Sequence, residues 1–164
     1  MKYSSNSIAN LIEDEFDYSD QELSASAIDG SMVENLTKSV SEVVGGETVE
    51  YSDYWSIASG FADHMEENLS EEYDMETAEF YSRISIAALG TIVGAEMKDE
   101  GFPEVDLESE WRVTGPLASG ICMKTGLINR GLDLGAYGVS WGETSELLEE
   151  ASKAGYRNSH NIKS

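Results

Sequence analysis

Apolar residues recur at helical spacing along most of the chain. The first stripe covers residues 8–16 and consists of Ile8, Leu11, Ile12 and Phe16. Two Ser-x-x-Glu patterns predict the next helices, over residues 19–30 and 31–45. In this pattern the serine hydroxyl and the glutamate carboxylate each accept a hydrogen bond from a backbone N–H group that the helix start leaves unpaired. A glycine ends both predicted helices.

The clearest amphipathic pattern covers residues 51–69. Its apolar face holds Tyr51, Tyr54, Trp55, Ala58, Phe61, Ala62, Met65 and Leu69, and most of the carboxylates lie off that face. A turn over residues 69–74 leads to a helix predicted over residues 75–98. The middle of this helix is apolar on nearly all sides, which is typical of a helix at the centre of a bundle.

A Gly-Phe-Pro sequence at residues 101–103 interrupts the helical pattern. We interpret it as a hinge over residues 100–104 within one domain, because too few residues follow for a second stable core. The chain then becomes glycine-rich up to Gly142. One helix over residues 114–132 and a series of short helices and turns both fit this segment, since each interior glycine costs a helix about 1 kcal/mol.

The last predicted helix starts at the capping box Ser140-Trp-Gly-Glu143 and ends at Gly155. Two short pieces, residues 47–51 and 110–114, carry weak signals of extended structure. The fold class predicted is all-α: a compact bundle of about five to seven helices with a glycine-rich C-terminal third. We expect a single acidic helical domain over residues 1–155 and a flexible basic tail over residues 156–164.

The composition favours a folded, intracellular protein. The chain has 164 residues, 40% of them hydrophobic, and a single cysteine, Cys122, so it has no internal disulfide. The N-terminus lacks the apolar stretch of a signal peptide, and no run of apolar residues is long enough to cross a membrane. We expect a cytoplasmic or virion location.

The charge is strongly one-sided. The formal net charge is −22, and residues 1–110 hold 27 carboxylates against four bases, whereas residues 111–164 hold five against six. Phosphate backbones and anionic lipids repel such a chain. We therefore expect neither direct nucleic-acid binding nor membrane binding.

No catalytic or metal-binding motif is complete. His64 lies beside Asp63 and Glu67, on what the pattern predicts to be the polar side of its helix, and we interpret it as a surface residue. The acidic stretch at residues 14–22 lacks the residue order of a calcium loop, and Ser119 lies in no nucleophile motif. We expect no catalytic residue, no metal site and no cofactor.

The densest acidic cluster is the candidate binding site. Residues 66–79 contain seven carboxylates and no base: Glu66, Glu67, Glu71, Glu72, Asp74, Glu76 and Glu79. Like charges at this spacing destabilise a helix by a few tenths of a kcal/mol per pair. A basic partner or abundant cations would offset that cost.

Two functions fit these observations, and a small helical enzyme is a third alternative that the incomplete motifs disfavour. The first is a non-enzymatic interaction protein whose carboxylates face a basic partner, at the limit a DNA mimic or an anti-defence, nuclease-inhibiting protein of a virus or mobile element. The alternative is a salt-adapted structural or assembly protein of a halophilic organism or its virus, a homo-oligomer through the glycine-rich segment. The charge asymmetry favours the first.

Overall fold

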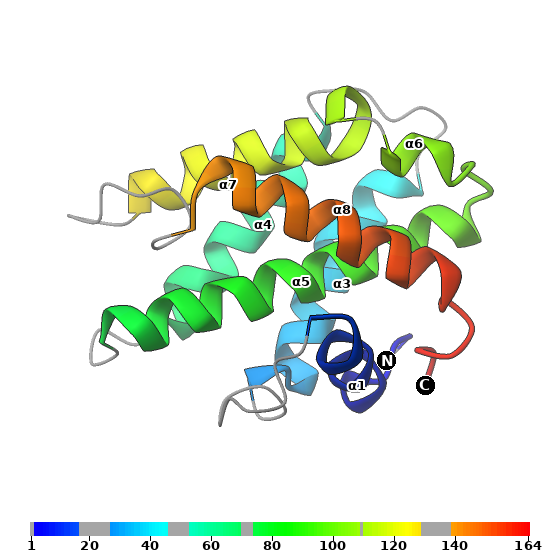
Figure 1. The fold of residues 1–164 in the computed structure, drawn as a ribbon, viewed down its shortest axis with the longest axis horizontal. Helices are drawn as coiled ribbons and strands as arrows, with labels where there is room; N and C mark the ends of the chain where they lie inside the picture. The colour runs from blue at the N-terminus through cyan, green and yellow to red at the C-terminus, as the bar shows by residue number, and fades with distance from the viewer. Residues whose placement is uncertain (1, 17–26, 46–52, 70–73, 109, 129–138) are drawn as a thin grey trace.

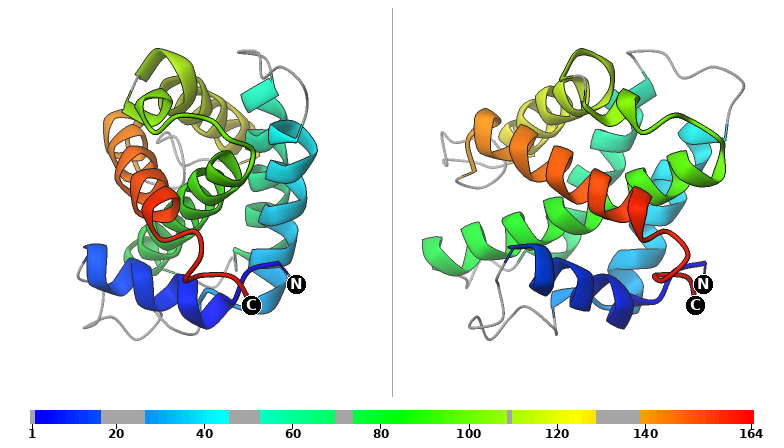
Figure 2. Two further views of the ribbon diagram at one scale, coloured as in Figure 1. Left: turned by 90° about the vertical axis from the view of Figure 1, so that its right-hand side faces the viewer. Right: turned by 45° about the vertical axis from the view of Figure 1, so that its right-hand side comes forward.

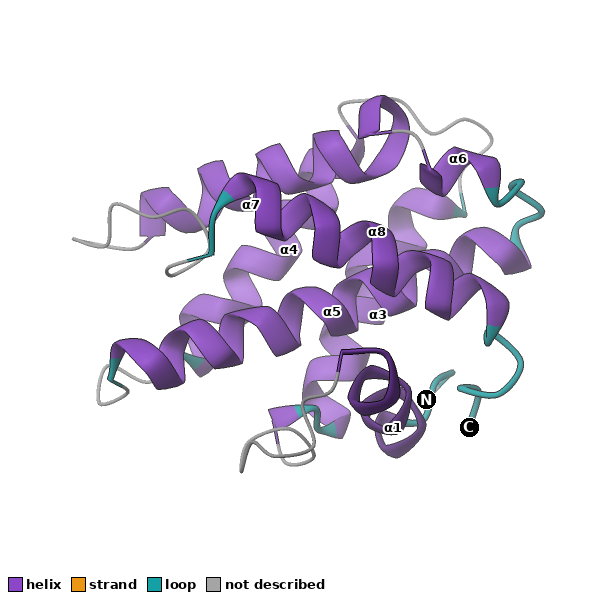
Figure 3. Cartoon of the chain, viewed as in Figure 1, coloured by secondary structure: helices purple, strands orange, loops and turns teal. Residues whose placement is uncertain are grey.

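The computed structural model describes residues 2–16, 27–45, 53–69, 74–108, 110–128 and 139–164 (Figure 1). These residues form α1 (Ser5–Phe16), α3 (Gly30–Val44), α4 (Asp53–Asn68), α5 (Met75–Asp99), α6 (Val105–Glu108), the π-helical turn η1 (Glu110–Thr114), α7 (Gly115–Ile128) and α8 (Trp141–Arg157). They include no β-strand, and the β-bridge among them joins Tyr3 to Lys163. The predicted all-α bundle is confirmed (Figure 3).

The helix α5 lies at the centre of the bundle, as its apolar pattern predicts. Every residue from Ile84 to Met97 is buried. The helices α8, α3 and α1 pack against α5, while α4 packs on α3 and α7. The end-on view in Figure 2 shows α3 and α4 on one side of α5 and α8 on the other. Two faces of the molecule are therefore available to solvent, one formed by α3 and α4 and the other by α8.

Glycines bring α5 and α8 into close backbone contact. A Cβ atom at Gly94 would overlap the backbone of Ser152, and one at Gly155 would overlap the backbone of Thr91. The prediction that Gly155 ends its helix is wrong, because α8 continues to Arg157. Gly155 instead allows α8 to pack closely on α5. The sequence alone does not distinguish a glycine that ends a helix from one that allows close packing.

The helix starts agree only in part with the capping patterns. Ser140 caps α8 as predicted, and its Oγ accepts a hydrogen bond from the Glu143 N–H at 3.2 Å. The helix α3 instead begins at Gly30, because Asp29, two residues before the predicted cap, accepts a hydrogen bond from the Met32 N–H at 2.8 Å. Aspartate caps helices as well as serine does, so the aspartate decides the start. The helix predicted to begin at residue 19 lies mostly outside the described residues.

The break after α5 is confirmed. The helix ends at Asp99, and Gly101 follows with φ of 83°, a conformation that glycine adopts without steric cost. The prediction of an extended piece over residues 110–114 is wrong, because these residues form η1 and lead directly into α7. Val113 and Thr114 are buried there, so tertiary packing outweighs a weak β-propensity. Residues 47–51 lie outside the described part of the chain.

One side of α7, in the glycine-rich segment, faces the interior, while Met123 on the same helix is exposed. Leu117, Ala118 and Ile121 of α7 are buried, and Gly120 lies against Ala58 of α4. An oligomer contact through these α7 residues would need them exposed. Leu117, Ala118 and Ile121 are therefore not available for such a contact.

The C-terminal segment, expected to be a flexible tail, packs against the N-terminus. Ile162 is buried, and the Ser4 N–H donates to the Ile162 carbonyl at 2.8 Å. The Ser164 N–H donates to the Lys2 carbonyl at 3.1 Å. The two ends of the chain are thereby joined beside the C-terminal end of α5 (Figure 1).

Candidate functional site

The exposed carboxylates of α3 and α4 form the candidate site, which we call the acidic face. On α4 the burial of Ile57, Phe61 and Met65 turns three acidic residues to solvent: Asp63, Glu66 and Glu67. On α3 the buried stripe similarly leaves Glu34 and Glu42 exposed. The local reason is amphipathicity, since the apolar residues of both helices face the core at helical spacing.

A shallow groove runs between the two helices. The helices touch where Gly60 faces Ser39, because a Cβ atom at Gly60 would overlap the serine side chain. Around this contact lies a hollow of about 610 Å³, lined by Ser39, Glu42, Val43, Asp53, Ser56, Ser59, Gly60 and Asp63. A neighbouring hollow of about 320 Å³ shares part of this lining and adds Asn35, Lys38, His64 and Glu67. Carboxylates and hydroxyls line the groove, so it suits cationic groups.

The ion pairs between described side chains lie elsewhere. They join Lys2 and Lys163 to the end of α5, Arg83 to Glu79 and Glu143, Arg112 to Asp106, Lys153 to Glu149, and Arg157 to Glu104. The five carboxylates of the acidic face (Glu34, Glu42, Asp63, Glu66 and Glu67) form no ion pair with another described residue. Lys38 is the one base in α3 and α4.

The predicted cluster over residues 66–79 is divided by the structure. Glu66 and Glu67 are exposed in the last turn of α4, and Asp74 and Glu76 are exposed at the start of α5. Asp74 also caps α5: the Thr77 N–H donates to its Oδ1 at 2.7 Å, and this bond lowers the pKa of Asp74. Glu79 is partly buried, 3.6 Å from Arg83. Glu71 and Glu72 lie outside the described residues.

The interpretation of His64 as a surface residue is wrong. Its side chain faces the core, the residue is 3% exposed, and burial lowers its pKa. Its Nε2 lies 3.2 Å from the Tyr81 hydroxyl of α5, and its Nδ1 lies 3.2 Å from Asn68 Nδ2. Residue spacing could have indicated this burial. His64 follows the apolar residues Ile57 by seven positions and Phe61 by three, and residues at these spacings share one face of a helix.

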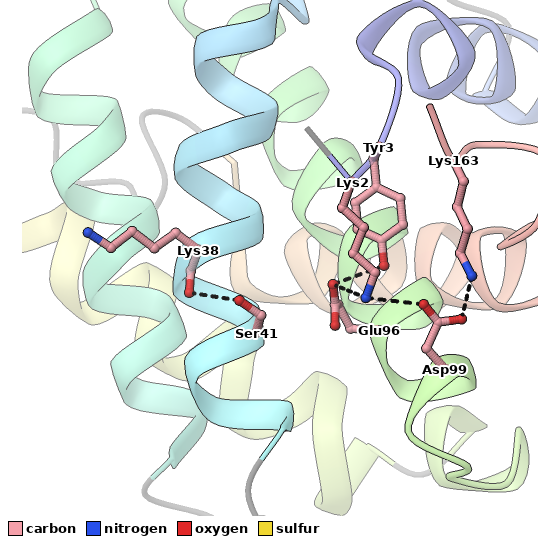
Figure 4. A network of polar contacts seen from close by, with 7 residues as sticks. All are labelled: Lys2, Tyr3, Lys38, Ser41, Glu96, Asp99 and Lys163. Carbon is pink, nitrogen blue, oxygen red and sulfur yellow. Dashed lines mark hydrogen bonds and ion pairs between the residues drawn. The ribbon is translucent and has the colours of Figure 1, made fainter.

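A second polar cluster, which the sequence did not indicate, joins both chain ends to α5 (Figure 4). Glu96 is buried and accepts hydrogen bonds from Lys2 Nζ and the Tyr3 hydroxyl, both at 3.0 Å. Asp99 lies 3.2 Å from Lys2 and 2.9 Å from Lys163. Burial and the charge of Glu96 raise the pKa of Tyr3, so this hydroxyl stays protonated as a donor.

Figure 4 also shows α3 beside this cluster, where the Ser41 hydroxyl donates to the Lys38 carbonyl at 3.4 Å. The Lys38 side chain is exposed and lines the smaller hollow of the groove. The lysine therefore partly offsets the negative charge there.

The described residues contain no group of three or more metal-ligating side chains placed to hold an ion. Ser119 is hydrogen-bonded to the indole Nε1 of Trp141 at 2.9 Å, so its partner is a donor that cannot act as a base. Cys122 is half-buried, with Sγ 4.0 Å from the Thr144 hydroxyl.

The fold and site together define an all-α protein with a carboxylate-lined groove. No protein-family model matches the chain, and neither a curated protein nor a solved structure matches it significantly. None of the described helices combines the length and the apolar character that a membrane span requires.

Proposed function

We propose that this protein is a non-enzymatic interaction protein whose acidic face binds a basic partner. The distribution of ion pairs carries this proposal. The bases of the described residues are used mainly at α5, α6 and α8, whereas the five carboxylates of the acidic face form no ion pair with a described residue and have only Lys38 nearby. A basic surface would supply that counter-charge.

Electrostatics favours fast binding of such a partner. A surface of one sign attracts the opposite sign over about 10 Å at 0.1 M salt and raises the association rate. Asp63, Glu66 and Glu67 lie within about 6 Å along the axis of α4, at the 1.5 Å rise of a helix. Phosphates along a DNA strand lie about 3.4 Å apart, so the charge density is similar.

The partner class that fits best is a nucleic-acid-handling protein. Its groove for phosphates would accept carboxylates at comparable density, and this protein would then act as a DNA mimic that inhibits a nuclease. Such inhibition is the anti-defence activity expected of a virus or mobile element. Serine hydroxyls in the groove add neutral hydrogen-bonding groups for arginine and lysine side chains.

Salt adaptation remains the second candidate, and one observation favours it. On the opposite side of the molecule burial and the neighbouring carboxylates Glu146, Glu149 and Glu15 raise the pKa of Glu150. Acid crowding is therefore not confined to the acidic face. A halophilic protein would carry such crowding over its whole surface, where abundant cations screen it.

A matched pair of charge reversals separates the two candidates. The variant Glu66→Lys/Glu67→Lys changes the acidic face, and Glu146→Lys/Glu150→Lys makes the same formal change on exposed residues of α8. The probe is a fluorescent dodeca-arginine peptide, followed by anisotropy at 0.05 and 0.3 M KCl. A panel of nucleases cleaving plasmid DNA provides a second readout.

We expect the α4 variant to bind the peptide about tenfold more weakly, equivalent to about 1.4 kcal/mol, and to lose nuclease inhibition. The α8 variant should change binding less than threefold, about 0.65 kcal/mol. Equal weakening by both variants would mean that net charge alone attracts the peptide, and the proposed face would then be abandoned in favour of salt adaptation.

A further inference from the structure

His64 lies at the contact between α4 and α5, beneath the acidic face. Its ring connects Asn68, one turn further along α4, with Tyr81 on α5, at 3.2 Å on each side. The residue also lines the smaller hollow between α3 and α4. An ionisable ring thus lies between the exposed last turn of α4 and the buried central helix.

The hydrogen bonds assign the protonation state of the ring. Asn68 Nδ2 donates to the His64 carbonyl at 2.8 Å, which fixes the amide with its NH₂ group toward α4. The same NH₂ group faces Nδ1, so Nδ1 must be the acceptor. Nε2 therefore carries the hydrogen and donates it to the Tyr81 hydroxyl oxygen. A second proton on Nδ1 would point at the Asn68 NH₂ group and find no acceptor.

The charged groups around the His64 ring offset only part of the cost of burying a protonated ring. Asp29, at the start of α3, and Glu67, on α4 itself, favour a positive ring, but burial outweighs them and the pKa of His64 is lowered. Lys38 and Glu42 from α3 and Asp63 from α4 line the same hollow. On α5 the facing group is the Tyr81 hydroxyl.

We propose that His64 is a proton-operated latch, which holds the last turn of α4 on α5 while the ring is neutral and releases that turn when the ring is protonated. Protonation removes one of the two acceptors of the Asn68 side chain and places a charge in the core. The turn that opens carries Glu66 and Glu67, so acidification loosens one end of the acidic face. This inference concerns the folding of α4 and stands whether or not the face binds a partner.

The direction of the pH effect follows from linkage. His64 has a lower pKa in the closed state than in the open state, where imidazole titrates near its ordinary value of about 6.5. The stability of the closed turn is complete above that value and is lost as the pH falls below it. One pH unit below, at about 5.5, the opening equilibrium rises by up to about tenfold, the limit that applies when the ring stays neutral in the closed state.

The test combines two NMR measurements on the full chain between pH 7.5 and 5.5. Imidazole ¹⁵N shifts follow the titration of each histidine, and amide exchange follows the opening of the turn. The reporter is the Leu69 N–H, which donates to the Met65 carbonyl at 2.8 Å, and the reference is the middle of α8. We expect the protection of Leu69 to fall several-fold, up to about tenfold, relative to α8 by pH 5.5.

The chain offers a matched control, because its other histidine, His160, is exposed. The pH dependence of Leu69 should disappear in His64→Gln and persist in His160→Gln. The near-isosteric Asn68→Asp supplies an acceptor for a second ring proton, so it should raise the pKa of His64 above that of the unchanged protein.

Three results would overturn the latch: a wild-type His64 that titrates at or above 6.5, pH-independent protection of Leu69, or an unchanged His64 pKa in Asn68→Asp. The wild-type titration needs no substitution, so the proposal is decided even if His64→Gln does not fold.

Discussion

Two buried ionisable residues, Glu96 and His64, have partners that lie far away in the sequence. Glu96 is 94 positions from Lys2, and His64 is 17 positions from Tyr81. A buried carboxylate is costly unless donors surround it, and here Lys2 and Tyr3 of the N-terminal segment supply those donors to Glu96. The position of the N-terminus therefore depends on one acidic residue of the central helix.

Removing one of those donors tests its importance. In Tyr3→Phe the ring stays buried, but Glu96 loses the hydroxyl that lies 3.0 Å away. We expect the free energy of unfolding in urea to fall by about 1–2 kcal/mol, the cost of a buried charged group that loses a hydrogen bond.

Tyr54→Phe is the control, since Tyr54 is 5% exposed and its hydroxyl makes no hydrogen bond with a described residue. It should change stability by less than about 0.5 kcal/mol. Equal losses in the two variants would show that the Tyr3–Glu96 bond contributes nothing specific.

At the level of elements, contact between α5 and α8 is the closest packing in the bundle. Gly94 and Gly155 each face the backbone of the other helix, with no room for a Cβ atom. Interior glycines weaken an isolated helix by about 1 kcal/mol each, so this pair is kept at the expense of local propensity. Close backbone approach buries Ala151 and Leu148 against α5 in return.

Gly94→Ala should force the two helices apart. We expect a loss of about 1–3 kcal/mol in unfolding free energy, the usual effect of overpacking a core, measured by urea denaturation.

Gly142→Ala is the matched control, because nothing lies within 4 Å of the added Cβ atom in the first turn of α8. Higher helix propensity should leave that variant unchanged or up to about 1 kcal/mol more stable. A stabilised Gly94→Ala would contradict the packing described for α5 and α8.

At the level of the whole molecule, the net charge of −22 is unevenly compensated. The C-terminal half of α5, together with α6 and α8, holds most of the ion pairs, whereas α3 and α4 hold none between described residues. Along the sequence, the excess of carboxylates ends at residue 110. In the folded molecule, the carboxylates with ion-pair partners lie outside the acidic face. Self-repulsion of the acidic face lowers the stability of the folded state at low salt.

The salt dependence of melting reports this repulsion. We expect a cooperative melt by circular dichroism already at 0.05 M KCl, with a Tm that rises as KCl screens the charge and levels off toward 1 M, where the screening length is about 3 Å. Helix formation only in molar salt would contradict the proposed binding function and indicate a halophilic origin of the acidity.

Single residues show the limits of the sequence at the site. Glu66 and Glu67 were placed correctly on the exposed side of their helix, because charge and periodicity agree there. His64 was misplaced, since a histidine between acids fits the surface equally well by pattern. Only its bonds to Tyr81 and Asn68 show that it is buried.

By itself the sequence determined the all-α class, the central place of α5, the Ser140 cap and the outward side of α4, because each follows from local periodicity or from neighbouring residues. Tertiary structure alone decided that Glu96, Asp99 and Glu104 gain a counter-charge from distant bases, that Gly155 packs rather than ends a helix, and that the C-terminus returns to Lys2. Those features depend on contacts between residues that are 50 or more positions apart in the sequence. Local sequence patterns do not predict such long-range contacts.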